Sequence, residues 1–177
     1  MRAAAAVVVA SGTLVAAVAA AIPSEDAPVP TRDCSGRTEP TRGHLRFATA
    51  NDVVIGPLSF TSLRLASSRR TGTQRPDGTI LIKAGAKVLW GPPVRVSVAA
   101  VDRARVSLEY TREPSPVVRF VQCPPGMRMW NGLRYLRVTG FSGGISLQRR
   151  GCYTLEVQAE GRRAYRRTVS LGGGTCG

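Results

Sequence analysis

The chain has 177 residues, and 25 lysine and arginine side chains outweigh 11 acidic ones to give a formal net charge of +14. This length suffices for one domain with a hydrophobic core, but not for two comfortable ones. A balance this basic directs attention to anionic partners such as nucleic acid, anionic lipid or an acidic polymer. The single histidine and the absence of a C-x-x-C pair among four cysteines argue against a zinc site, and no cofactor is expected.

Residues 1–21 have the layout of a secretory signal peptide, with one positive charge, an apolar run and small residues at its end. Ala19-Ala20-Ala21 fits the A-x-A cleavage pattern and Pro23 stops any helix from continuing, so we expect cleavage after residue 21. An uncleaved N-terminal anchor is the alternative, because residues 3–22 are long enough to cross a bilayer of about 30 Å. Alanine inserts weakly and Ser11-Gly12-Thr13 interrupts the run, which favours a secreted or cell-envelope-associated protein without stable membrane insertion.

Residues 22–43 are rich in proline and lack a hydrophobic period, which predicts an N-terminal linker before a domain of residues 44–177. Alternation of apolar and polar residues recurs through that domain. Residues 75–78 are typical of a turn, and Glu160-Gly161 of a hairpin tip. The expected strands are residues 44–49, 53–65 with a break at Gly56-Pro57, 79–83, 88–90, 93–98, 105–110, 117–123, 133–138, 152–159 and 164–171.

Short strands at regular spacing, each with one apolar and one polar face, are typical of two packed sheets. We therefore predict an all-β fold, an Ig-like antiparallel β-sandwich stapled by disulfides and preceded by the signal-peptide helix. A small closed barrel is the alternative, but the five strands of an oligonucleotide-binding barrel are fewer than the candidates found here. Phe60, Tyr110, Phe120 and Tyr153 fall at core positions in the alternation.

The four cysteines are predicted to form two disulfides, because an even number of cysteines in an exported chain is usually oxidised. Four cysteines allow three pairings. Cys123 would end one strand and Cys152 begin another, both on the polar side, which favours a bond between them. Cys34 would then pair with Cys176 and tie the start of the domain to its end, helped by the flexible Gly172-Gly173-Gly174.

Several segments taken in order carry a resemblance to known proteins. "DVVIGPLSF", the alternating "VRVSV" and "RVSLEY", "VRFVQC", "MWNGLRYL", "GCYTLEV" and a terminal cysteine follow one another along most of the mature chain. In this order the chain resembles secreted small β-proteins of high-GC actinobacteria whose function is not known. The resemblance implies export, disulfides and a β fold, and it implies no activity.

Arginines near the C-terminus form a candidate anion-binding site, because the planar guanidinium group suits phosphate and carboxylate. An anionic cell-surface polymer or an acidic protein would be the partner. The alternative is a solvated strand face in a chain whose codons favour arginine over lysine, and arginine on outer strand faces also discourages edge pairing. The candidate residues are Arg149, Arg150, Arg162, Arg163, Arg166 and Arg167.

Trp130 and Tyr135 are candidates for a second kind of contact, stacking on a sugar ring or anchoring a protein partner. The alternative is that they cap the core of the sandwich. Binding of single-stranded nucleic acid requires exposed aromatic residues interleaved with basic ones. The other aromatic residues fall at core positions, so the sequence argues against a nucleic-acid partner.

Catalytic motifs are missing from the sequence, so we expect a non-enzyme. His44 is the only imidazole and no serine lies in a G-x-S-x-G elbow. A hydrolase that uses surface carboxylates such as Glu109 and Glu156 is the alternative, although ion pairing with arginine explains these residues more simply. The sequence thus predicts a secreted interaction or envelope-associated module, and it leaves the oligomeric state open.

Overall fold

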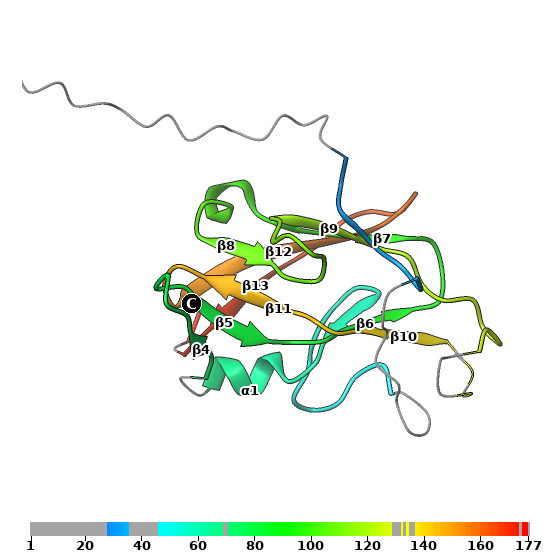
Figure 1. The fold of residues 1–177 in the computed structure, drawn as a ribbon, viewed down its shortest axis with the longest axis horizontal. Helices are drawn as coiled ribbons and strands as arrows, with labels where there is room; N and C mark the ends of the chain where they lie inside the picture. The colour runs from blue at the N-terminus through cyan, green and yellow to red at the C-terminus, as the bar shows by residue number, and fades with distance from the viewer. Residues whose placement is uncertain are drawn as a thin grey trace, which may run out of the picture.

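The alternating segments form strands, and the chain is mostly β with two sandwich-like layers (Figure 1). The structure is a computed structural model that describes residues 28–35, 46–68, 71–128, 132, 134, 137–173 and 175–176. The expected signal peptide, Trp130 and Tyr135 lie outside the described residues.

Most strands are short, and two longer ones form a hairpin near the C-terminus. The elements are β1 (Thr31–Arg32), β2 (Val53–Ile55), β3 (Leu58–Phe60), α1 (Leu63–Ser68), β4 (Thr73–Gln74), β5 (Ile80–Lys83), β6 (Ala86–Leu89), β7 (Val94–Val98), the 3-10 helix η1 (Ala100–Asp102), β8 (Val106–Leu108), β9 (Val117–Phe120), β10 (Val138–Phe141), β11 (Gly144–Leu147), β12 (Gly151–Ala159) and β13 (Tyr165–Leu171).

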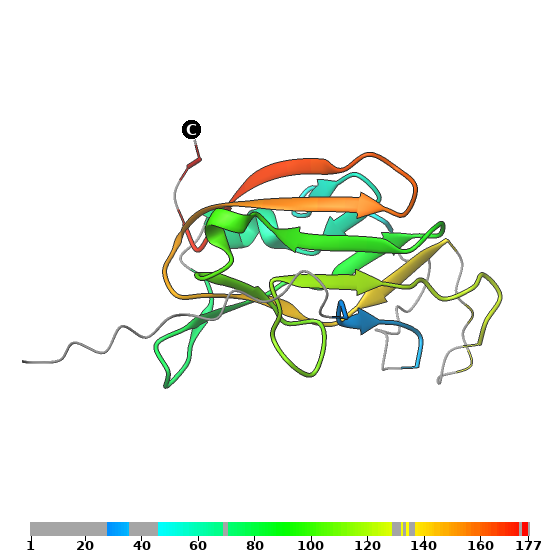
Figure 2. The ribbon, with the colours of Figure 1, turned by 90° about the horizontal axis from the view of Figure 1, so that it is seen from above.

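The first layer is a five-stranded sheet in the order β1-β9-β7-β12-β13, and β1 is parallel to its neighbour whereas the other pairs are antiparallel. Figure 2 looks onto this sheet, with β12 in orange and β7 in green. The β12–β13 hairpin turns at Gly161, whose φ of 72° suits glycine, as the sequence predicted. Strand β1 lies within the expected linker, so part of that segment belongs to the sheet, and the domain boundary stays a prediction.

The second layer bends in its middle. Strand β5 is followed by β6 with only Ala84-Gly85 between them, and β10 by β11 with only Ser142-Gly143 between them. Because β6 pairs with β10 and β5 with β11, the bend divides one long antiparallel pair between two four-stranded sheets, β10-β6-β3-β2 and β4-β5-β11-β8. The Tyr110 hydroxyl donates to the Ala84 carbonyl (2.5 Å), which fixes the bend from the core side.

The inward faces of the two layers form one hydrophobic core. The aromatic residues predicted to lie in it are buried, and the Phe120 ring contacts the rings of Tyr110 and Phe141 at centroid distances of 5.2 and 5.1 Å. Val94, Val96 and Val98 of β7 face the same core, as their alternation predicted. Burying a phenylalanine side chain contributes about 1.5–3 kcal/mol.

One predicted strand is wrong and a second is right only up to Phe60. Residues 46–49 form a loop, and the segment expected to be a strand up to residue 65 ends as one at Phe60 and continues as helix α1. A buried ion pair explains both differences. The Asp52 carboxylate accepts hydrogen bonds from the backbone N–H groups of Thr49 and Ser62 (2.9 Å each) and pairs with Lys87 (2.6 Å). These long-range contacts override local strand preference.

All four cysteines are in disulfides, but the predicted pairing is wrong, because the bonds join Cys34 to Cys123 and Cys152 to Cys176. Strands β9 and β12 are both antiparallel to β7, so they run in the same direction. Cys152 is the second residue of β12 and Cys123 lies beyond the end of β9, so the two are at opposite ends of the sheet. Ala159 and Phe120 both lie opposite Val94, so they are level with each other across the sheet. Cys152 is seven residues before Ala159 on β12, which places it about 23 Å along the strands from the end of β9.

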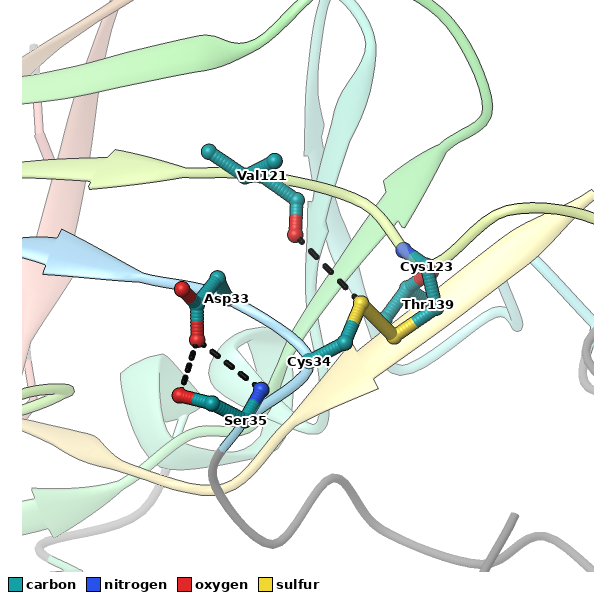
Figure 3. Close-up of a disulfide and its surroundings, with 6 residues drawn as sticks. All are labelled: Asp33, Cys34, Ser35, Val121, Cys123 and Thr139. Atoms are coloured by element: carbon teal, nitrogen blue, oxygen red, sulfur yellow. Dashed lines mark hydrogen bonds between the residues drawn. A yellow bond between two sulfur atoms is a disulfide. The ribbon is translucent and has the colours of Figure 1, made fainter. Parts of the chain in front are cut away.

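The observed bonds join cysteines that lie at the same end of the sheet. Cys34 follows β1, which is parallel to β9, and the Cys123 N–H donates to Thr139 Oγ1 (3.0 Å) (Figure 3). At the other end, Gly172 and Gly173 have φ values of 89° and 114° and turn the chain back toward Cys152. The glycines therefore act as predicted but serve a different partner.

Candidate functional site

The outward face of the five-stranded sheet carries the arginines that the structure brings together. Alternation along the strands points Val94, Val96 and Val98 toward the core, so Arg95 points outward. In register with Arg95 lie Arg119 of β9 on one side and Gln158 of β12 on the other. Two residues along β12, Glu156 lies opposite Arg166 of β13.

Arg95 and Arg119 lie directly opposite each other on adjacent strands. The Arg119 N–H donates to Pro30 of the β1 segment (2.9 Å), on the side of β9 that faces away from β7. Arg95 and Arg119 are therefore a non-hydrogen-bonded pair of the antiparallel ladder, the kind whose side chains lie closer together. Like charges in this position destabilise a sheet.

The tip of the β12–β13 hairpin adds one arginine. Gln158 Nε2 donates to the Arg162 carbonyl (3.0 Å), which places Arg162 beside the outward row that contains Arg95. The Arg163 guanidinium instead lies over the ring of Tyr165, 5.8 Å from its centroid, and Tyr165 is opposite the core residue Val157, so this contact is on the inward side of β13. We call Arg95, Arg119, Arg162 and Arg166 the outer arginine face.

Glutamates neutralise only part of this face. Arg119 pairs with Glu160 (2.7 Å), and Arg166 pairs with Glu156. No ion pair of Arg95 or Arg162 is found among the described residues. Two carboxylates thus face four guanidinium groups, and the face keeps a positive charge.

The six arginines predicted from the sequence do not converge. Arg149 and Arg150 precede the start of β12, whereas Arg162 and Arg163 follow its end, about 26 Å away along a strand of nine residues. Arg150 donates to the carbonyls of Thr71 and Gly172 (2.9 Å each), so it connects two loops. The predicted cluster is therefore wrong as a single site.

Arg167 is also not part of the predicted cluster, because its side chain lies on the other side of the sheet. It lies opposite the core residue Leu155, so its side chain emerges from the inward face of the edge strand β13. There its guanidinium donates to the Val54 carbonyl of β2 (3.0 Å) and joins the two layers. Of the six predicted arginines, Arg162 and Arg166 remain in the outer arginine face.

Sequence reasoning missed Arg95 and Arg119, although a signal was present. Both stand between core valines or aromatic residues in alternating segments, which puts them on the outward face of their strands. That β7 and β9 are neighbours, and in this register, is a property of the tertiary fold.

The structure does not bring Glu109 and Glu156 together. Glu109 follows β8 in the second layer and accepts two hydrogen bonds from Arg75 (2.6 Å each), whereas Glu156 lies on the outward face of the first layer and pairs with Arg166. Each therefore has an arginine partner of its own, as the ion-pairing interpretation expected.

Within the described residues, no cluster of three or more histidine, cysteine or acidic side chains is arranged to hold a metal ion. Over the same part of the chain, no helix has the length and apolar character needed to cross a bilayer. The two disulfides are compatible with an extracellular location.

Comparison with known proteins finds no matching family model, curated protein or solved structure.

Proposed function

We propose that this chain is a secreted, non-enzymatic binding module of Ig-like sandwich architecture that associates with the cell envelope by binding an anionic surface polymer. The outer arginine face is its binding surface. The charge of the chain, its two disulfides and the convergence of four arginines on one sheet face support this function.

The observation that carries the proposal is the opposed pair Arg95 and Arg119. Arginine on an outer strand face can protect a sheet edge from pairing with another chain. This explanation does not apply to Arg95, because β7 is the central strand of five and has a neighbour on each side. Glu160 pairs with Arg119, so Arg95 is the guanidinium group of this pair that keeps its charge, and an anion bound to Arg95 would offset its repulsion with Arg119.

A polymer suits the face better than a compact acidic ligand. Two strand spacings and two residues along the strands separate Arg95 from Arg166, which is about 12 Å between their Cα atoms. Guanidinium groups at such intervals on a twisted but open sheet match an extended chain with repeated carboxylate or phosphate groups.

The test is binding of the oxidised chain of residues 22–177 to polyglutamate and to polyphosphate, between about 50 mM and about 500 mM NaCl. We expect affinity to fall steeply with salt, and Arg95→Glu and Arg166→Glu each to weaken binding about tenfold. Arg112→Glu is the matched control, because Arg112 is exposed and lies in the loop after β8, outside the outer arginine face.

Three results would contradict the proposal. Binding that ignores salt removes its electrostatic basis. Equal weakening by Arg112→Glu and Arg95→Glu would show that only the net charge matters. Binding to an acidic protein but to neither polymer would replace the polymer by a protein partner.

A further inference from the structure

A cleft of about 460 Å³ opens where the second layer bends. Its lining includes Leu81 and Lys83 of β5, which alternate with the buried Ile82, so the cleft lies on the outward face of this layer. The outer arginine face belongs to the other layer. The cleft is therefore a separate feature on the opposite side of the sandwich.

Two glycines form part of the wall of the cleft, and the close packing behind this wall leaves no room for a side chain at either. A Cβ atom at Gly143 would lie 2.3 Å from the Tyr110 ring, and one at Gly144 would lie 2.5 Å from the Ile82 carbonyl oxygen. A side chain at either position would displace the core or the neighbouring strand. The bend thus exposes backbone to the cleft, where a ligand can approach it closely.

Lys83 is the cationic side chain in the wall of the cleft, and it is exposed. No ion pair of Lys83 occurs among the described residues. Glu109 also lines the cleft, but both of its carboxylate oxygens accept hydrogen bonds from Arg75, 2.6 Å each. The ammonium group of Lys83 is therefore the charge that remains for a ligand.

The turn that supplies Thr61 and Ser62 to the cleft has a strained backbone, and a hydrogen bond to the buried Asp52 holds it in place. Ser62 is the one non-glycine residue with a positive φ in the described part of the chain, at 59°. Its N–H donates to Asp52, which is itself fixed by the buried Lys87. Strained backbone that the surrounding structure holds in place clusters at binding and catalytic sites.

A second cavity of about 290 Å³ adjoins the first and shares Ser62, Leu81 and Lys83 with it. This second cavity adds the side chain of Leu65, which is 39% exposed, and Ile82. Lys83 lies at the boundary between the two cavities. The first cavity is the more polar one and contains serine and threonine residues, and the second is more apolar. Such a groove matches a ligand with hydroxyl groups, one negative charge and a short apolar substituent.

We propose that the cleft at the bend binds a small anionic amphiphile, with its charged group on Lys83, its hydroxyl-bearing part against the Thr61-Ser62 turn and its apolar substituent against Leu65. This site does not depend on the outer arginine face. Carboxylate and phosphate head groups share the chemistry that Lys83 recognises.

The test uses calorimetric titration of the oxidised chain of residues 22–177 with probes that differ in one part. Hexyl glucuronide carries all three features, hexyl glucoside lacks the charge, glucuronate lacks the apolar chain, and hexyl phosphate replaces the sugar acid by phosphate. We expect hexyl glucuronide to bind about tenfold more tightly than hexyl glucoside, because a hydrogen bond to a charged group is worth about that factor. Tighter binding of hexyl phosphate than of hexyl glucuronide would assign the charged group as phosphate.

Lys83→Met keeps the length of the side chain and removes its charge, so we expect it to abolish the difference between hexyl glucuronide and hexyl glucoside. Arg149→Met, at an exposed residue outside the cleft, is the matched control and should leave that difference unchanged. Leu65→Ser should weaken hexyl glucuronide but not glucuronate. Equal binding of the charged and neutral probes, a difference that survives Lys83→Met, or no binding of any probe at millimolar concentration would overturn the proposal.

Discussion

The two layers of this sandwich carry different surfaces because their strands are paired differently. In the five-stranded sheet the register is regular, so every second residue faces outward and the polar side chains form an open array. In the bent layer, Ala84-Gly85 and Ser142-Gly143 interrupt the long antiparallel pair of strands. The alternation of inward and outward side chains is therefore separate in the β5–β11 part and in the β6–β10 part. The interruption creates a cleft in which strained backbone and a few polar groups converge.

The regular sheet has the geometry for an extended partner, whereas the bent layer has the geometry for a small ligand. An array of arginines offers many equivalent contacts over a wide area. A cleft offers a few different groups within a small volume, which selects for shape and for single charges. If the two layers bind independently, a change in one should leave binding by the other unaltered.

The largest effect is expected from the disulfide that closes the longer loop. Replacing Cys34 and Cys123 by serine opens a loop with a separation of 89 residues and should lower the free energy of unfolding by about 4–5 kcal/mol. Replacing Cys152 and Cys176, separated by 24 residues, should cost about 3–3.5 kcal/mol. Urea unfolding of the two double variants measures both. A larger loss from the second pair would contradict the assignment of stability to loop length.

The next effect concerns the buried ion pair beneath the cleft. Asp52→Ala leaves the ammonium group of Lys87 buried without its carboxylate and should lower the free energy of unfolding by about 3–5 kcal/mol. Glu113→Ala, at an exposed acidic residue, is the control and should change it by less than about 0.5 kcal/mol. Urea unfolding checks both variants, and similar losses would show that Asp52 acts only through the net charge.

The same ion pair makes a prediction about pH. Burial of the Asp52 carboxyl group acts to raise its pKa, but hydrogen bonds from Lys87, Ser62 and Thr49 outweigh burial and hold the pKa below its ordinary value of 3.8. A carboxyl group with a lowered pKa stabilises the fold above the pKa of the unfolded chain and loses that contribution as pH falls through its folded pKa. The stability difference between wild type and Asp52→Ala should therefore be constant above about pH 5 and shrink below 3.8. A difference that stays constant down to pH 2 would contradict this role.

The smallest effect is expected from adding one methyl group at the bend. Gly143→Ala places a Cβ atom against the Tyr110 ring, which the hydrogen bond to Ala84 holds in place, and should cost about 1–3 kcal/mol. Gly91→Ala is the matched control, since no atom lies within 4 Å of its Cβ position. Thermal unfolding measures both. If the layers are independent, Gly143→Ala should weaken binding of hexyl glucuronide and leave polyglutamate binding unchanged, whereas a loss of both would show that the bend supports the whole sandwich.

Local pattern was sufficient for the features that depend on neighbouring residues. Alternation identified β7, β9, β12 and β13 of the first layer but not β1, and it placed Phe120 and Tyr153 in the core because side chains on a strand point to opposite faces in turn. The turn before Thr79 and the hairpin tip at Gly161 followed from residues that favour a positive φ or a fixed turn. Local pattern did not predict the short helix α1. The chain leaves β3 where the Ser62 N–H donates to Asp52, which lies ten residues earlier and is held in turn by Lys87, so the end of the strand depends on distant residues.

The residue pattern was enough to predict that the chain is mostly β, that its cysteines are oxidised and that certain arginines point away from the core. The pairing of the strands establishes which of them are neighbours and in which direction each runs, and so which cysteines bond, which arginines form one face and where the second layer bends. The difference arises because these features depend on contacts of different sequence separation. The face to which a side chain points is fixed by its own strand, whereas its neighbours across the sheet are fixed by pairing between segments that lie far apart in the chain.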